Sequence, residues 1–222
     1  MAASDPIWVN PYMRGAGNNK GLYPEFADYD PDIDPSPFRV AASRAVKFDL
    51  TPLEHMPTFL HLGGLLRGRR RDSDLNLDKM PDFFTIADGG IAVSHALADL
   101  LQRHNMGHNQ LKSLDVYEGP DRNVTTGHSF VFVDVCELKS AFLPELSKGF
   151  IKVRNTNFYN VVEAGALVAL KYQDDNGIDI WRDRVLGGDG LFLSDRLKRA
   201  LDGAAFKLGR FATKKCKIHF EN

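Results

Sequence analysis

Two stretches of this chain share one pattern of hydrophobic and polar positions, one hundred residues apart. Gly90–Leu101 and Gly190–Leu201 each begin with glycine, pass through a short apolar segment and reach a serine. Counted from the apolar residue just before each serine, Val93 or Leu193, apolar residues recur at i+4, i+7 and i+8, which places them on one helix stripe. A serine hydroxyl at a helix start can accept an unsatisfied backbone N–H. The pattern therefore predicts two similar strand-or-turn units, each leading into a helix capped by Ser94 or Ser194.

The stripes also predict which helix residues are buried, namely Leu97, Leu101, Leu197 and Leu201. A solenoid needs about three or more repeats to bury its core, so two copies favour one globular protein with two anchor helices. The alternative is that Ser-x-x-Leu is simply a common way to begin a helix.

Strand patterns fill most of the remaining chain. Alternating or continuous apolar runs predict strands at 38–50, 111–117, 130–138, 150–153, 158–162, 167–172 and 216–220. Residues 83–86 lead into the first helix, and residues 178–181 follow a turn and precede the second. The run at 130–138 is apolar on both faces and is expected at the centre of a sheet. Residues 53–66 fit a helix or a strand equally well. The first helix is expected to stop near Gly107. The predicted class is α+β, with a mostly antiparallel sheet and few helices on one face.

The first part of the chain has a different composition from the rest. Residues 1–37 are rich in Pro, Gly, Asn and Asp, with aromatic residues among them, which predicts an irregular segment draped on the body. Residues 38–222 are expected to form a single α+β domain, with a division into two lobes, at about 38–140 and 141–222, as the alternative.

Composition excludes several classes of protein. The chain has 222 residues, of which 43% are hydrophobic and 26% charged, and its formal net charge is -1. No global field therefore draws it to nucleic acid or an anionic membrane. The two cysteines, Cys136 and Cys216, are too few for a disulfide framework, and buried free thiols are expected. Neither a secretory signal nor an apolar run of roughly 18 residues is visible, so a cytoplasmic protein without a membrane span is expected.

Charge is unevenly distributed beneath the neutral sum. Residues 25–34 hold five acidic residues and no basic one, with Phe26 and Tyr29 among them as possible aromatic anchors. Four arginines lie between Arg67 and Arg71, and residues 194–217 hold eight basic residues against two acidic ones. Such asymmetry suits either a charged partner or pairing within the chain. The predicted partner-binding residues are Glu25, Phe26, Asp28, Tyr29, Asp30, Asp32, Asp34, Arg67, Arg69, Arg70 and Arg71.

No set of residues predicts a catalytic centre or a cofactor site. His104 and His108 have the spacing of a paired metal site, with His95 nearby, but Gly107 interrupts the helix and no Glu completes a His-Glu-x-x-His motif. Ser94 and Ser194 lack the flanking glycines of a nucleophile elbow, which favours capping. The glycine-rich turn at 187–190 lacks the Lys-Ser/Thr of a phosphate loop. We expect a protein that is not an enzyme and binds no metal.

From about Pro81 onward, the chain resembles a known family, the eleventh immunity-protein family of bacterial polymorphic toxin systems. The resemblance depends on Asp82–Phe84, Ile91–Leu97, Leu111–Tyr117, Phe130–Cys136, Ile180–Arg182 and Leu191–Leu201. Members close with a Gly-x-x-Phe element after the last helix. The counterpart here, Lys207–Phe211, departs from it in spacing. Residues 1–37 lie outside the resemblance.

The resemblance implies a protein that binds a cognate secreted toxin stoichiometrically and protects the producing cell. It brings no catalytic residues and does not identify the toxin. Two other functions remain open from the residues themselves. One is a nucleic-acid-associated protein that uses Arg67–Arg71 and the basic C-terminal stretch. The other is an uncharacterised enzyme with a site around His95, His104 and His108.

Overall fold

Strands far outnumber helices in the part of the chain that the structure describes. This computed structural model describes residues 5–10, 22–25, 56–62, 75–86, 90–163, 165–172, 177–186, 190–209 and 211–220. These ranges hold 15 strands and 2 α-helices, and most neighbouring strands are antiparallel. The predicted α+β class is confirmed, although the strands form two large and two small sheets.

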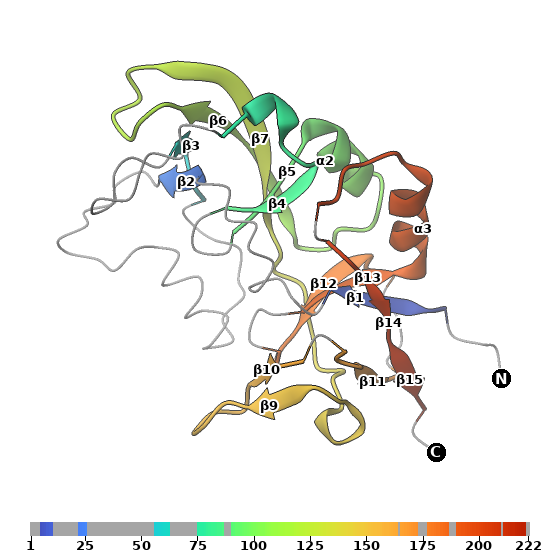
Figure 1. Cartoon of the computed structure of the whole chain (residues 1–222). Coiled ribbons are helices and arrows are strands. Elements are labelled where there is room, and N and C mark those ends of the chain that lie inside the picture. Colours follow the sequence, from blue (N-terminus) through green and yellow to red (C-terminus); the bar gives the residue numbers. More distant parts are fainter. Residues whose placement is uncertain are drawn as a thin grey trace.

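The larger of the two main sheets has six strands. They are β2 (Leu22–Glu25), β3 (Phe59–Leu62), β4 (Phe83–Thr85), β5 (Ile91–Val93), β6 (Gln110–Tyr117) and β7 (Thr125–Asp134). Their order in the sheet is β2-β3-β6-β7-β5-β4, and only the β3–β6 pair is parallel (Figure 1). The strand predicted to be central, β7, lies between β5 and β6 as expected.

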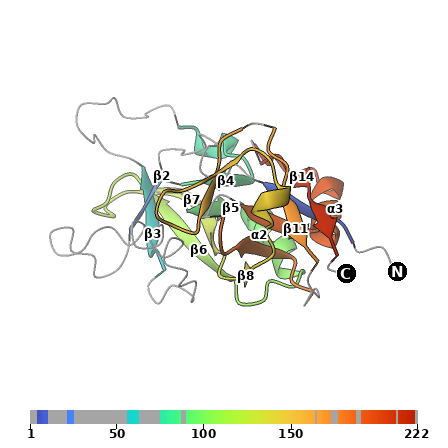
Figure 2. The same ribbon diagram turned by 90° about the horizontal axis from the view of Figure 1, so that it is seen from below.

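The other main sheet has five strands. They are β1 (Ile7–Asn10), β8 (Leu138–Lys139), β12 (Ile180–Asp183), β13 (Leu191–Ser194) and β14 (Lys214–Lys215). Their order is β14-β1-β13-β12-β8, and only the β12–β8 pair is parallel. Seen from below, β2 and β3 lie at one end of the molecule, with β14 near the other (Figure 2).

Two small sheets complete the strands. β9 (Phe150–Lys152) and β10 (Tyr159–Val161) form a hairpin, while β11 (Ala169–Lys171) runs parallel to β15 (Lys217–His219). These four strands lie below the five-stranded sheet in Figure 1. Single 3₁₀ turns are present at Leu77–Lys79 and Pro144–Leu146.

Both predicted helices begin where the sequence places them. α2 spans His95–Gln102 and α3 spans Asp195–Gly203. The Ser94 hydroxyl accepts the N–H of Leu97 at 3.3 Å, and the Ser194 hydroxyl accepts that of Leu197 at 3.1 Å. Both N-caps are therefore confirmed. α2 ends earlier than predicted, well before Gly107, because the residues after Arg103 form a loop that reaches the second half of the chain.

The two units agree in strand register as well as in sequence. In the first unit β5 lies between β4 and β7, and in the second β13 lies between β12 and β1. Val93 of β5 is paired with Val131, and Leu193 of β13 is paired with Trp8 at the matching place. The fourth strands also correspond, since β6 flanks β7 and β14 flanks β1. A shared helix start alone does not account for this agreement, so the repeat is a unit of four strands and one helix.

Each unit is held by the loop that follows the helix of the other unit. Asp82 precedes β4, and it both donates its N–H to the carbonyl of Lys207 and accepts the N–H of Lys207 on its carboxylate, at 2.7 Å each. Asp179 precedes β12 and exchanges the same two bonds with Asn105, at 2.8 Å each. The contact is reciprocal, as at the interface of a twofold-symmetric dimer.

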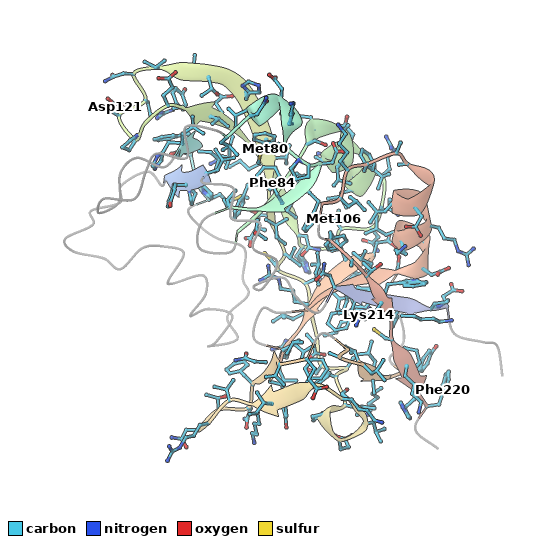
Figure 3. The ribbon with its side chains drawn as sticks, in the orientation of Figure 1. Met80, Phe84, Met106, Asp121, Lys214 and Phe220 are labelled. Atoms are coloured by element: carbon cyan, nitrogen blue, oxygen red, sulfur yellow. The ribbon has the colours of Figure 1, made fainter. Side chains whose placement is uncertain are left out.

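The two crossing loops have the same backbone shape. Gly107 and Gly209 have φ values of +56 and +58, in the left-handed region that favours glycine. The residue before each glycine, Met106 or Leu208, packs against the main core, and Figure 3 labels Met106. The glycines therefore turn each loop so that an apolar side chain enters the core between the units.

This main core is shared by both units. The stripe residues Leu97, Leu101, Leu197 and Leu201 are all at most 5% exposed, as predicted, and they pack with the inner faces of β5 and β13. An enclosed cavity of about 20 Å³ lies among apolar side chains of both units. The outer faces of the two main sheets have separate cores, centred on Phe84 and Phe132 in one and on Trp181 and Phe192 in the other. Both cysteines are buried and free, as expected.

The prediction that residues 1–37 are irregular is wrong at β1 and β2. β1 occupies the place in the second unit that β7 occupies in the first, and its Val9 is fully buried there. Four residues between Pro6 and Pro11 are too few to show an alternating pattern, so local sequence does not reveal this strand. The strand expected at 38–50 lies outside the described residues, and the undecided stretch 53–66 contains β3.

Candidate functional site

Most of the residues predicted to bind a partner lie outside the described part of the chain. Glu25 is the exception, since it ends β2 and is paired with Phe59 at the edge of the six-stranded sheet. The residues outside the described ranges are Phe26, Asp28, Tyr29, Asp30, Asp32, Asp34, Arg67, Arg69, Arg70 and Arg71. The acidic and arginine-rich segments therefore stay predictions.

The basic C-terminal stretch is partly neutralised within its own unit. Lys198 forms an ion pair with Asp202, and Arg199 forms one with Asp195 at 2.5 Å. Arg196 binds the buried carboxylate of Asp179 at 2.7 Å. Part of the positive charge that the sequence assigns to this surface is thus paired locally, which reduces the charge it presents to nucleic acid or to an acidic partner.

The three histidines considered as metal ligands have separate partners. His95 Nε2 lies 2.9 Å from the hydroxyl of Ser129, and His108 Nδ1 lies 2.8 Å from a carboxylate oxygen of Glu137. His104 Nδ1 lies 3.4 Å from Asp179. Among the described residues, no group of three His, Cys, Asp or Glu side chains is placed to hold a metal ion. We expect elemental analysis of the purified protein to find less than one zinc per chain.

Asp179 is the centre of the most elaborate polar cluster among the described residues. Its side chain is fully buried, and its carboxylate accepts hydrogen bonds from the backbone N–H of Asn105, the hydroxyl of Ser194 and the guanidinium of Arg196. Burial acts to raise the pKa of Asp179, but these hydrogen bonds and the charge of Arg196 outweigh it and lower the pKa. The carboxylate is therefore held in its charged form.

The chemistry of this cluster is structural. Ser194 uses its hydroxyl twice, donating to Asp179 and accepting from Leu197, and the lowered pKa of Asp179 makes that carboxylate a weak base toward the hydroxyl. His104 faces the carboxylate and not the hydroxyl. The cluster joins the start of α3 to the loop after α2, and so fastens the two units together.

The two capping serines are expected to differ in their contribution to stability. Ser94→Ala removes one capping bond and should lower the free energy of unfolding by about 0.5–2 kcal/mol. Ser194→Ala also removes a donor to a buried carboxylate, so its loss should be larger by about 1.5 kcal/mol or more. Chemical denaturation of both variants measures the difference. Equal losses would show that the Ser194–Asp179 bond contributes nothing beyond the cap.

The hairpin of β9 and β10 presents apolar side chains to solvent. We define the β9 surface as Leu146, Ile151, Val162 and Leu167, which are between 48% and 58% exposed. Ile151 is paired with Asn160 and the N–H of Val162 is bonded to the carbonyl of Gly149, so Ile151 and Val162 lie on the same face of the hairpin. Leu167 forms a bridge with Lys148, at the start of β9. Grouped exposed apolar residues of this kind are typical of binding regions.

Gly149 fixes the shape of this surface at the base of the hairpin. It has a φ of +80, and a Cβ at this position would lie 2.9 Å from the Cα of Ala166. Only glycine therefore allows Ala166 to lie against the start of β9. This close approach places Leu167 beside Lys148.

Sequence reasoning missed the β9 surface because Phe150 and Ile151 look alike in the pattern. Adjacent strand residues point to opposite faces, and Phe150 packs inward on Phe142, with ring centroids 5.0 Å apart. Ile151 therefore points outward. The signal that could have revealed it is the short length of the two predicted strands, since a two-stranded hairpin buries only one face.

Comparison with protein-family models and with curated proteins found no match for this chain. Within the described ranges, neither helix has the length and apolar character needed to cross a lipid bilayer. The fold and the site thus define an α+β protein of two interlocked units with an exposed apolar hairpin.

Proposed function

We propose that this protein is an immunity protein, which binds and neutralises a cognate secreted toxin in the cytoplasm of the producing bacterium. It acts without catalysis, by occupying the toxin through a protein–protein interface, and protects the cell in competition between bacteria. The family to which we assign it is the eleventh immunity-protein family of polymorphic toxin systems, which the sequence resembles.

The observation that carries the proposal is the β9 surface. Apolar side chains grouped on a surface hairpin suit a protein partner better than a small solute or a phosphate backbone. The resemblance supplies the kind of partner, since its segments coincide with β4, β5, α2, β6 and β7 in the first unit and with β12, β13 and α3 in the second. The local pairing of Lys198, Arg199 and Arg196 favours this function over nucleic-acid binding.

Co-expression with the product of the neighbouring gene tests the proposal. Cells that produce that protein alone should lose viability, and cells that also produce this chain should grow normally. The two proteins should co-purify in a fixed ratio. A catalytically inactive toxin variant should still co-purify, which would show that this chain binds the toxin itself and does not act on what the toxin produces.

Two results would contradict the proposal. Viability that does not depend on this chain would remove the immunity function. Tight binding of nucleic acid that falls steeply with added salt would favour the nucleic-acid alternative, because such binding releases counterions.

A further inference from the structure

The β9 strand has an edge that no described strand pairs with along most of its length. Val153 donates its N–H to the carbonyl of Phe158, and Val162 donates to the carbonyl of Gly149. Residues 149, 151 and 153 therefore direct their backbone groups toward β10, and the residues between them direct theirs away from it. The outward groups belong to Lys148, Phe150 and Lys152.

Only the first of these three positions is paired. Lys148 exchanges two backbone bonds with Leu167, at 2.9 and 3.0 Å. Beyond it, the N–H and C=O groups of Phe150 and Lys152 have no backbone partner within the described ranges. β10 lies between β9 and the five-stranded sheet in Figure 1, so this edge faces away from that sheet. Unpaired backbone groups on an edge strand are a template for a further strand.

The side chains beside this edge indicate the composition of the strand that would pair with it. Ile151 is 57% exposed and lies between the two outward-facing residues. Residues 148–154 hold three basic side chains and no acidic one, and all three are exposed. The turn at 152–157 curves around an open hollow of about 380 Å³, with Lys152 and Arg154 in its wall.

The basic side chains beside this edge favour an acidic segment of another protein over a second copy of this chain. A second copy of this chain pairing along the same edge would bring lysines of the two copies together, and like charges on paired strands are destabilising. Lysine on an edge strand is a common guard against such self-pairing. An acidic segment of another protein meets the same lysines with opposite charge.

We propose that the free edge of β9 accepts an extended, acidic segment of the toxin as an additional β-strand. The inference depends on the proposed function, because it assigns the toxin as the partner. Main-chain bonds to Phe150 and Lys152 give the pairing, the β9 surface receives the apolar side chains of the added strand, and Lys152 and Arg154 meet its carboxylates.

The test measures binding of the purified toxin to variants of the full chain. Ile151→Asp places a charge in the apolar surface, and Lys152→Pro removes an outward N–H without removing a bond to β10. Each should raise Kd at least about tenfold, as expected for residues at the centre of an interface. Val124→Asp is the matched control, because Val124 is also half exposed, near Asp121 at the tip of the β6–β7 hairpin (Figure 3). It should change Kd less than about twofold.

Hydrogen exchange gives a second readout that is independent of folding defects in the variants. The amides of Phe150 and Lys152 should exchange rapidly in the free protein and become protected in the complex, because strand pairing occupies them. Contact through side chains alone would leave these two amides unprotected. The affinity should also fall as salt rises from about 0.05 to 0.5 M, because oppositely charged groups meet at the edge.

The outcomes separate the two proposals. If the wild-type chain neither binds nor protects, the proposed function is wrong and this inference falls with it. Suppose instead that the wild type binds, that Ile151→Asp and Lys152→Pro bind as tightly as Val124→Asp, and that the amides of Phe150 and Lys152 stay unprotected in the complex. Then only the edge pairing is overturned. A loss of binding confined to the charge reversal of Asp28, Asp30 and Asp32 would place the interface on the acidic segment instead. A wild-type dimer that Ile151→Asp dissociates would identify a second copy as the occupant.

Discussion

Replacing Asp179 with alanine is expected to lower the free energy of unfolding by about 3–4 kcal/mol, because hydrogen bonds to a charged group contribute roughly 1.5–3 kcal/mol each and are not additive. The carboxylate is fully buried and is the common acceptor for Asn105, Ser194 and Arg196. Its loss also removes one of the two bonds between residues 179 and 105, while the backbone bond from the N–H of residue 179 to the Asn105 carbonyl remains. Denaturant titration of the wild type and the variant measures this change, provided that both show the same dependence of the free energy of unfolding on denaturant concentration.

Asp82→Ala is the matched control, because Asp82 occupies the equivalent place in the first unit. Its carboxylate accepts one bond, from the N–H of Lys207, at a solvent-exposed site. The expected loss is about 0.5–1.5 kcal/mol, as for a single hydrogen bond. Equal losses at the two positions would show that the additional donors around Asp179 add nothing to stability.

The contribution of Asp179 should also depend on pH. Its pKa is lowered in the folded protein, so the stabilisation is fully present above the pKa of an unfolded aspartate, at about 3.9. It is lost as the pH falls through the lower native pKa, because the folded state must then be protonated. The difference in stability between the wild type and Asp179→Ala should therefore be constant above about pH 5 and shrink below about pH 4. A constant difference down to pH 2 would contradict the lowered pKa.

Leu197→Ala is expected to cost about 2–5 kcal/mol, the range for removing a buried leucine side chain. Leu197 is fully buried in the core between the units. The core already contains a small cavity, and because α3 is fixed at its start by the Ser194 cap, the helix cannot move freely to fill the new space. A decrease in the free energy of unfolding of less than about 0.5 kcal/mol would show that this helix face is not part of the core.

Two further variants make the Leu197 result interpretable. Leu97→Ala removes the equivalent side chain of α2, which is 1% exposed, and should cost a similar amount. Leu146→Ala removes a leucine that is 48% exposed, and should change stability by less than about 0.5 kcal/mol. A large loss for Leu146→Ala would mean that the β9 surface is structural.

The elements set by local chemistry could be predicted from the sequence. Ser94 and Ser194 could be predicted as caps because the hydroxyl, the preceding apolar segment and the apolar helix stripe lie within a few residues of one another. The central position of β7 could be predicted because Phe130–Val133 is apolar on both faces. The bonds from Asp82 to Lys207 and from Asp179 to Asn105 join residues 125 and 74 positions apart. No local pattern encodes such contacts.

A gapless comparison of the two repeats also hides part of their correspondence. The equivalence of Gly90 with Gly190 has an offset of one hundred, but the β4–β5 and β12–β13 connections differ in length, and so do the segments after the helices, so the offset changes at both places. Asp82 and Asp179 therefore do not align in the same frame as the serines. The predicted partner-binding segments stand out by their charge, and exposed apolar side chains such as Ile151 have no charge signature.

The position of β1 has a consequence for biosynthesis. Trp8 pairs within the second unit and donates its indole N–H to Asp195, 187 residues later, so β1 leaves the ribosome long before β13 and β14 exist. At ~5–20 residues per second, translation of that interval takes about 10–40 s. The strands from β4 to β7 are contiguous in the chain and can pair during this time, but their inner face has no second unit to cover it. The nascent chain must therefore hold an apolar sheet face and an unpaired strand in solution until synthesis is nearly complete, which makes this protein a candidate for chaperone protection on the ribosome.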